Sequence, residues 1–295
     1  MRFSCILIIL SVVFSATFYN DPILIHKNSK TVALGNIGEF NEDASAIFDN
    51  PSYLSTQENN ITITHYRFMS DFTYSNLAAK YGPFGFGLVM IGASDYNTAV
   101  DAYGEFIPAG SYSYNNAVYL LSHSSQRNNL CFGVTGKLYT SNLDNISASG
   151  FNIDASTTIL LKELTISAII TNLFNNGKNS IKWNNGDNTE DLHSTLALAG
   201  MYNLNPVKLY AKTTAFLNAP IDPLINLGAS YSIESLVDLM LGYTQYYSDN
   251  KKQSAMSYGV AINLGNLGVT YSANPVKTVD GYYEGIQQLS FRVKI

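Results

Sequence analysis

Charged residues, cysteine and tryptophan are all scarce in this sequence. Charged side chains make up 13% of the 295 residues, roughly half the share of about 25% that is usual for a soluble domain. The 17 lysines and arginines are outnumbered by 22 acidic residues, and this net charge of −5 argues against nucleic acid as a partner. Cys5 lies in the leader described next, which leaves Cys131 without a partner for a disulfide or a cysteine-rich metal site.

Long apolar runs are also lacking, with one exception at the N-terminus. Residues 5–14 (CILIILSVVF) are continuously apolar or small, Arg2 precedes them, and residues 13–15 offer a cleavage site. This pattern predicts a secretory signal peptide over residues 1–15. The alternative, a membrane anchor, needs about 20 apolar residues, and polar residues from Thr17 onward interrupt the run too early. We therefore expect an exported protein without a transmembrane helix.

Aromatic residues and glycine, by contrast, are plentiful. The chain has 21 Tyr, 15 Phe and 21 Gly, and 46% of its residues are hydrophobic. Disordered chains have high charge and few aromatics, and helical membrane proteins have a higher mean hydropathy than the +0.02 found here. This composition favours many β-strands.

From about residue 59 to the C-terminus, large apolar residues stand at every second position. Leu130, Phe132 and Val134, for example, alternate with Cys131 and Gly133. A period of two places each set on one face of a strand. The second face is mainly Gly, Ser, Thr, Asn and Ala, whereas a soluble sandwich would carry charged residues there. The pattern predicts an all-β fold, a transmembrane antiparallel β-barrel, with these charged residues as candidates to face the lumen: Lys137, Asp154, Lys162, Lys208 and Lys212.

Runs of suitable length predict fourteen strands within residues 59–295. Each strand with its connection then takes about 17 residues, and a tilted spanning strand itself needs about 9–11. Two inserts, 94–110 and 175–190, are expected to be extracellular loops. The last run alternates up to Ile295, as in the closing strands that the outer-membrane assembly machinery recognises. The predicted strands are 60–68, 71–81, 84–93, 111–123, 129–140, 148–162, 163–172, 191–204, 207–218, 224–233, 236–247, 252–264, 266–273 and 284–295.

Residues 16–58 do not alternate and form a separate N-terminal segment. Asn41 is a plausible N-cap of a short helix, because Glu42 and Asp43 follow it and suit the positive end of a helix. Pro51 is expected to end that helix.

This segment resembles the N-terminal signature of the PorV/PorQ family, within the wider group of FadL-like outer-membrane barrels. That signature is an Ala-(Leu/Met)-Gly-Gly run, then an acidic DDASA run, then an Asn-Pro pair. Asn36, Asp49 and Ser52 depart from it. The matching residues are Ala33, Leu34, Gly35, Gly38, Asp43, Ala44, Ser45, Ala46, Asn50 and Pro51.

The resemblance implies a barrel of fourteen strands whose N-terminal segment folds into the lumen as a plug. The chain is shorter than typical members, so reduced extracellular loops are expected. Glu42 and Asp43 would need cationic partners inside the barrel, and the lumen-facing lysines named above are the candidates. The alternative is a periplasmic tail outside the barrel.

No pattern of catalytic, metal-binding or cofactor-binding residues stands out. The four histidines are isolated from one another and from Cys, which makes a metal site improbable. Ser122-His123-Ser124 invites comparison with outer-membrane hydrolases, but a polar strand end is the simpler interpretation. Phosphate-loop, dinucleotide and nucleophile-elbow motifs are missing. We expect no enzyme activity and no cofactor.

Three functions remain for an outer-membrane barrel of this kind. The resemblance to PorV and PorQ implies protein export and surface attachment, as in type IX secretion, with secretion-system components or exported proteins as partners. The wider resemblance to FadL implies uptake of hydrophobic small molecules. A structural barrel in the outer-membrane lipid is the third. The spacing of the signature favours the first, whereas short loops leave little surface for binding cargo.

Overall fold

The computed structural model describes residues 27–68, 72–100, 106–174, 181–185, 189–218, 222–248, 251–277 and 283–295. The predicted signal peptide at residues 1–15 and the first part of the N-terminal segment, residues 16–26, lie outside these ranges. Strands predominate in the described ranges and all belong to one sheet. The predicted all-β fold is confirmed.

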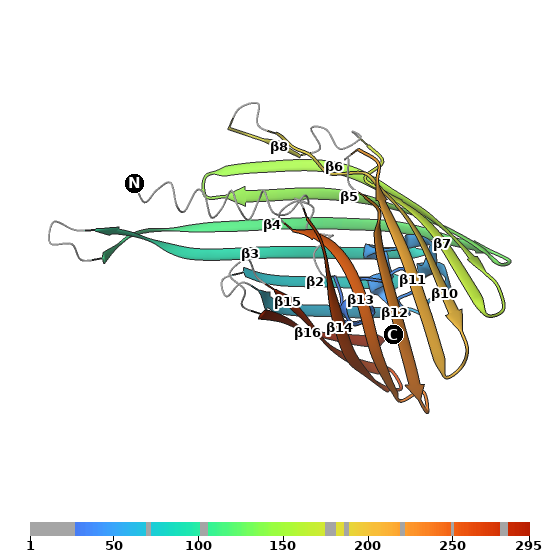
Figure 1. The fold of residues 1–295 in the computed structure, drawn as a ribbon. Coiled ribbons are helices and arrows are strands. Elements are labelled where there is room, and N and C mark those ends of the chain that lie inside the picture. Colours follow the sequence, from blue (N-terminus) through green and yellow to red (C-terminus); the bar gives the residue numbers. More distant parts are fainter. Residues whose placement is uncertain are drawn as a thin grey trace.

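Fourteen antiparallel strands close into a barrel (Figure 1), which confirms the predicted number. Consecutive barrel strands pair with each other, and β1 pairs with β16 from Asn60 opposite Lys294 to His65 opposite Leu289. Closure leaves no strand edge unpaired, as lipid requires. The barrel strands are β1 (Asn60–Phe68), β2 (Phe72–Tyr81), β3 (Phe84–Val100), β4 (Phe106–Arg127), β5 (Leu130–Leu143), β6 (Ile146–Leu160), β7 (Leu164–Thr171), β10 (Thr195–Asn203), β11 (Val207–Phe216), β12 (Leu224–Ile233), β13 (Val237–Ser248), β14 (Lys251–Leu264), β15 (Leu267–Lys277) and β16 (Tyr283–Lys294).

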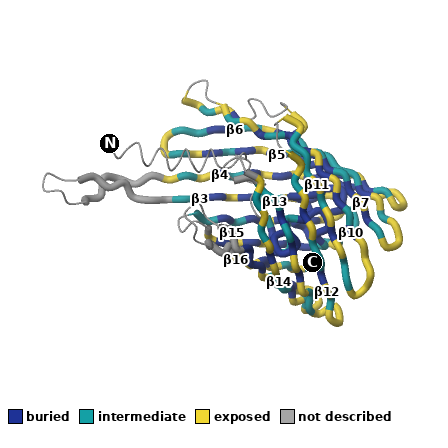
Figure 2. The backbone as a smooth tube through the Cα atoms, viewed as in Figure 1, coloured by how far each residue is buried: buried dark blue, intermediate teal, exposed yellow. Residues whose placement is uncertain are grey.

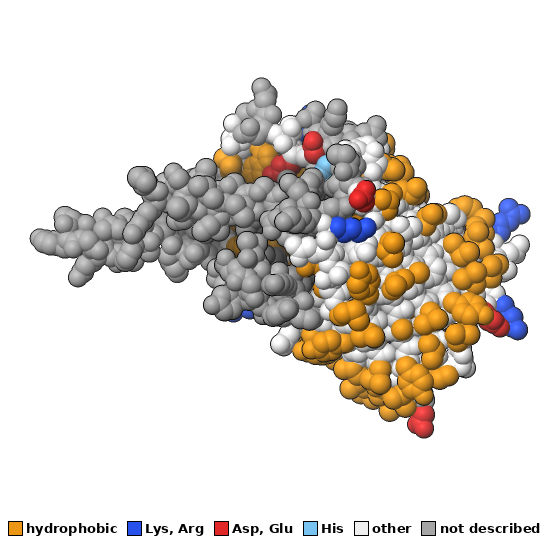
Figure 3. All heavy atoms as spheres, viewed as in Figure 1, with side chains coloured by type: hydrophobic (Ala, Val, Ile, Leu, Met, Phe, Trp, Pro, Cys, Tyr) orange, Lys and Arg blue, Asp and Glu red, His pale blue; other side chains and the backbone are white. Residues whose placement is uncertain are grey.

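The alternation of side chains puts the apolar residues on the outside of the barrel. On β5, Phe132, Val134 and Leu138 are 48–49% exposed, whereas Thr135 and Lys137 are buried. Exposed and buried residues alternate in the same way along the other strands (Figure 2). Hydrophobic side chains are spread over the outer surface (Figure 3). An apolar exterior around a polar interior is the arrangement of a barrel in lipid.

The two ends of the barrel differ in their connections. At one end the strands are joined by short turns such as residues 82–83, 128–129 and 265–266, and the chain enters and leaves the barrel there. The other end carries the longer connection 172–194 between β7 and β10. Bacterial barrels have short periplasmic turns and longer extracellular loops. The end with the short turns is therefore the periplasmic end.

The insert 94–110 was predicted as an extracellular loop, but its described residues, 94–100 and 106–110, are strand; residues 101–105 lie outside the described ranges. β3 and β4 pair as far as Val100 opposite Phe106, with a register shift between Asn97 and Thr98. Figure 1 shows this hairpin reaching far beyond the neighbouring strands. Hydrogen bonds between the backbones of two strands do not require apolar side chains on one face. The strands can therefore continue beyond the point where the alternation in the sequence ends. In the second insert, 175–190, two short strands, β8 (Ile181–Trp183) and β9 (Thr189–Glu190), continue the sheet from β6.

In the described residues before the barrel there are three short helices: α2 (Ser29–Ala33) and the 3₁₀ turns η2 (Ala44–Phe48) and η3 (Pro51–Thr56). Asp43, not Asn41, is the N-cap of η2, because its carboxylate accepts a hydrogen bond from the Ser45 amide at 2.9 Å. Pro51 begins η3 instead of simply ending the helix before it, since proline fits the first position of a helix. Among the described residues, no helix has the length and apolarity that crossing a bilayer demands.

Candidate functional site

Residues 27–58, here called the N-terminal segment, lie against the inner wall of the barrel. α2 contacts β13 to β16, whereas η2 contacts β1 to β3 and η3 contacts β4 to β6. The strands that contact α2 and those that contact η3 lie nearly opposite each other on the ring, and the strands that contact η2 lie between them. Every residue from Asp43 to Leu54 is buried. The described part of this segment therefore spans the lumen from wall to wall.

The run Ala33-Leu34-Gly35 packs directly on the backbone of β12, β13 and β14. Gly35 has a φ of +71°, and a Cβ atom there would lie 2.5 Å from the carbonyl oxygen of Tyr243. On the wall, a Cβ atom at Gly228 would lie 2.8 Å from the carbonyl oxygen of Leu34. The amide of Asn226 donates to the carbonyl oxygen of Gly35 at 2.7 Å. Glycine on both sides thus permits contact between the two backbones.

A second contact is made by Asn50, Pro51 and Ser52 on β5, β6 and β7. The Asn50 side-chain amide donates to the hydroxyls of Thr158 at 3.0 Å and Ser167 at 3.1 Å. The backbone amide of Ser52 donates to the Ser156 hydroxyl at 2.8 Å. Small hydroxyl side chains on the wall therefore satisfy the polar groups of this turn, where Asn50 itself is fully buried.

Glu42 joins the segment to the periplasmic end of β11. Its carboxylate lies 3.2 Å from Nζ of Lys30 and 2.5 Å from Nζ of Lys208. The charge of Lys30, aided by Lys208 and opposed by burial, lowers the pKa of Glu42 to about 2. Burial disfavours a charge on Lys30, but the combined attraction of Glu42, Tyr210, Asp238 and Asp43 outweighs it and raises the pKa of Lys30. Glu42 and Lys30 therefore stay charged at neutral pH.

Glu39 and Asp49 of the segment also form ion pairs. Glu39 lies 2.6 Å from Nζ of Lys212 on β11, and Asp49 lies 2.7 Å from Nζ of Lys27. Burial raises the pKa of Glu39, and the attraction of Lys212 opposes that rise. Sequence reasoning named Lys212 as a lumen-facing cation but did not single out Glu39 as its partner. Glu39 lies in a stretch without alternation, so the sequence does not indicate which way its side chain points.

The structure corrects two expectations about charged residues. Asp43 was expected to pair with a lumen-facing lysine, but it caps η2, because the backbone amide and hydroxyl of Ser45 are its donors. Lys162 was expected to face the lumen, but β6 ends at Leu160 and Lys162 lies in the following turn. Its side chain is 92% exposed, and Nζ is 3.8 Å from the carboxylate of Glu163. The predicted strand ran two residues too far, which put a turn residue on the lumen face.

The remaining matching residues of the signature lie between these contacts. Gly38 sits against Asp49 and Thr31, where a Cβ atom would be 2.7 Å from the Thr31 hydroxyl. Ala44 and Ala46 are fully buried in η2. The backbone amide of Ala44 donates to the side-chain oxygen of Asn60 at 2.7 Å, at the start of β1.

Lys137 and Asp154 form a buried ion pair on the inner wall, with 2.7 Å between them. Their side chains are 1% and 6% exposed. Asn172, which follows β7 with a φ of +54°, accepts hydrogen bonds from Lys137 and from the hydroxyl of Tyr139. Its backbone amide donates to Asp154 at 2.9 Å. Asn172, which the sequence did not single out, links the two charges at the point where β7 ends.

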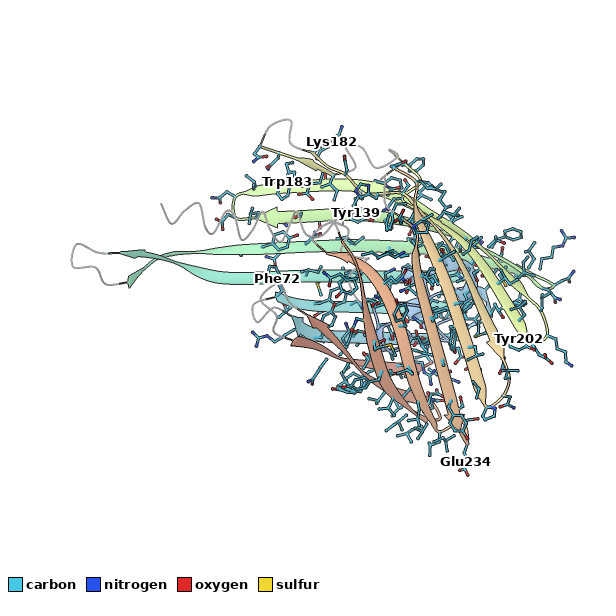
Figure 4. All side chains as sticks on the ribbon, in the orientation of Figure 1. Phe72, Tyr139, Lys182, Trp183, Tyr202 and Glu234 are labelled. Atoms are coloured by element: carbon cyan, nitrogen blue, oxygen red, sulfur yellow. The ribbon has the colours of Figure 1, made fainter. Side chains whose placement is uncertain are left out.

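The buried side chains of β1 to β5 include a large apolar cluster, here called the apolar side of the lumen, whereas those of β12 to β16 are mainly polar. Phe72, Tyr139 and Trp183 belong to the apolar side, and Figure 4 shows them away from Tyr202 and Glu234 at the periplasmic end. The apolar side comprises the buried Tyr66, Tyr74, Val89, Ile91, Val118, Leu120 and Tyr139, packed with Ile47, Phe48 and Leu54 of the N-terminal segment. The polar side, on β12 to β16, comprises Asn226, Thr244, Ser257, Ser272, Gln288 and Ser290. In the described residues, no three His, Cys, Asp or Glu side chains are grouped to hold a metal ion.

Several solved structures share this architecture. The Pseudomonas putida toluene transporter TodX superposes with a TM-score of 0.59 at 12% identity, over 92% of this chain and 99% of its own. The monoaromatic hydrocarbon channel CymD gives 0.62 at 11% identity, over 94% and 99%. The Ralstonia pickettii toluene transporter TbuX gives 0.60 at 8% identity, over 92% and 99%. The sequence matches no family model and no curated protein.

The fold is therefore that of the FadL-like outer-membrane barrels. Together with the apolar exterior, it makes this protein an outer-membrane β-barrel. The resemblance to FadL-like barrels is confirmed at the level of the fold, whereas the narrower PorV/PorQ assignment remains a prediction.

Proposed function

We propose that this protein is a channel through which hydrophobic small molecules cross the outer membrane. The apolar side of the lumen is the observation that carries the proposal. Val89, Ile91, Val118 and Leu120 are at most 6% exposed and form one inner surface of β3 and β4. A channel for polar solutes has a polar, water-filled interior. An apolar surface inside a barrel instead offers a nonpolar molecule a path with little contact with water.

The N-terminal segment supports this proposal because it spans the lumen and narrows any open aqueous path. Its ion pairs and wall contacts hold it in place, while its own Ile47, Phe48 and Leu54 add to the apolar side. Fold relatives named as a toluene transporter and a monoaromatic hydrocarbon channel favour the same function. We infer a filter that excludes hydrated solutes and admits nonpolar ones.

Uptake of radiolabelled toluene by a bacterial host tests the proposal. Cells that produce the protein should accumulate the label faster than cells that do not. Ile91→Asn, on the apolar side, should slow uptake, whereas Met90→Asn, on the outer face one residue away, should not. Equal uptake with and without the protein would contradict the channel function.

Protein export or surface attachment is the second candidate. The PorV/PorQ-like runs 33–35, 43–46 and 50–51 favour it, with secretion-system components or exported proteins as partners. Chemical cross-linking in the native host, followed by purification of the barrel, tests this function. Recovery of an exported protein, and its loss from the cell surface when the barrel is deleted, would support export. Unchanged surface proteins together with reduced toluene uptake would favour the channel.

A further inference from the structure

A groove of about 340 Å³ lies on the outside of the barrel, over β2 to β5. Strand register places most of its lining in two adjacent rows. Thr73, Gly92, Asn115 and Asn142 are opposite one another across the four strands, and Ser75, Met90, Ala117 and Thr140 form the next row. The volume is at the lower end of the range of about 300–1,000 Å³ that is typical of small-ligand sites.

The groove lies at the edge of the lipid-facing apolar surface of the barrel, on the side away from the periplasm. The next row toward the periplasm is Leu77, Leu88, Tyr119 and Leu138. Leu77, Tyr119 and Leu138 are 42–50% exposed and face lipid. On the other side of the groove, β3 and β4 continue for many residues beyond Gly92 and Asn115. The groove is therefore at the extracellular surface of the bilayer, where lipid headgroups lie.

Small residues form its hollow. A Cβ atom at Gly92 would lie 3.1 Å from Oδ1 of Asn115 and 3.7 Å from the Thr73 hydroxyl, so these two polar ends flank the space above Gly92. Ala117 is the neighbouring small residue. The ring of Tyr119, 50% exposed, borders the groove on the lipid side. Among the described residues, its lining contains no lysine, arginine, aspartate or glutamate.

We propose that this groove binds the sugar headgroup of a glycolipid in the outer leaflet. Uncharged amide and hydroxyl side chains donate to and accept from sugar hydroxyls, and an exposed tyrosine ring presents an apolar face with a polar tip. The groove is continuous with the lipid-facing apolar surface. A glycolipid whose acyl chains lie against Leu77, Tyr119 and Leu138 therefore has its headgroup in the groove. This inference is independent of what passes through the lumen.

Titration of the purified full chain in detergent with fluorescently labelled lipopolysaccharide tests the proposal. Gly92→Leu fills the groove and should weaken binding about tenfold, the effect of losing roughly 1.4 kcal/mol. Gly200→Leu is the matched control, because a Cβ atom there has no neighbour nearer than 4.0 Å, on the outer face of β10. It should bind like the unaltered chain. Should Gly92→Leu fail to fold, Asn115→Ala with Asn142→Ala removes the amides without adding bulk.

Binding equal to that of the unaltered chain in both groove variants would overturn the proposal. So would equal affinity for labelled phosphatidylethanolamine, which has no sugar. Arg67 on β1 lies opposite Thr73. If Arg67→Gln weakens lipopolysaccharide binding and the groove variants do not, the lipid is bound by attraction between its negative charges and Arg67 instead of by the groove. Oligomers that dissociate in Gly92→Leu but not in Gly200→Leu, without any change in lipopolysaccharide binding, would assign the groove to a second copy of the chain.

Discussion

Replacing Gly242 by leucine should detach the N-terminal segment from the barrel wall. Gly242 is buried on β13, and a Cβ atom there would lie 2.5 Å from the carbonyl carbon of Leu34 and closer still to the backbone nitrogen of Gly35. These are backbone atoms, so no side-chain rotation removes the overlap. The run of residues 33–35 must move away from the wall.

The cost follows from what that movement breaks. The hydrogen bond from the Asn226 amide to the Gly35 carbonyl, 2.7 Å long, is lost, and such a bond contributes about 1 kcal/mol. Leu34 is 1% exposed, and full burial of a leucine contributes about 1.5–3 kcal/mol. Loss of both weakens docking by about 2.5–4 kcal/mol, which is roughly a seventyfold to several hundredfold change in the docked population.

Single-channel conductance in planar bilayers, with limited proteolysis of the same samples, measures this change. Gly242→Leu should raise the conductance and expose residues 27–58 to protease. Gly200→Leu on the outer face is the control, since a Cβ atom there meets nothing within 4 Å except the Thr165 carbonyl oxygen at that distance. If both variants conduct and resist protease alike, the close packing of glycine on glycine does not hold the segment, and the reasoning is refuted.

Three other changes test the remaining parts of the structure. Leu227→Arg, in the middle of β12 on the lipid face, should cost about 2–4 kcal/mol of unfolding free energy, and Leu236→Arg in a turn only about 0–1 kcal/mol; urea unfolding followed by heat-modifiable gel mobility compares them. Lys137→Met should cost about 3–5 kcal/mol by leaving Asp154 buried and unpaired, and Asp154→Leu added to it should recover most of the loss; a double variant as unstable as the single one would count against the pair. Glu42 has a lowered pKa of about 2, so its contribution, about 1 kcal/mol because the carboxylate is partly exposed, is present above its unfolded pKa and is lost as pH falls from about 4.5 toward 2. The melting temperature of Glu42→Gln should therefore differ from that of the unaltered chain at pH 6 but not near pH 2.

The class of fold follows from the residue pattern alone, because lipid imposes one simple rule on every strand. A residue on a spanning strand faces either hydrocarbon or the lumen, so the alternation of Phe132 and Val134 with Gly133 and Thr135 could be assigned without knowing any neighbour. The same rule accounts for the number of strands and for the inward position of Lys137, Asp154, Lys208 and Lys212. The rule does not apply at strand ends, which lie outside the hydrocarbon. There the predicted β3 and β4 are too short, and Lys162 is wrongly assigned to the lumen face.

The partners inside the barrel, in contrast, became evident from the three-dimensional arrangement. Whether Glu42 meets Lys208 or Lys137 depends on which part of the ring the N-terminal segment crosses, and residues 16–58 carry no periodic pattern that encodes this. Gly228 and Gly242 look like any other small lumen residues in the sequence, yet the backbone of residues 34 and 35 rests on them. The outer groove arises in the same way, because Gly92 and Asn115 become neighbours only through strand register. Local chemistry chooses the face of each residue, but contacts between distant segments depend on how the closed ring brings them together.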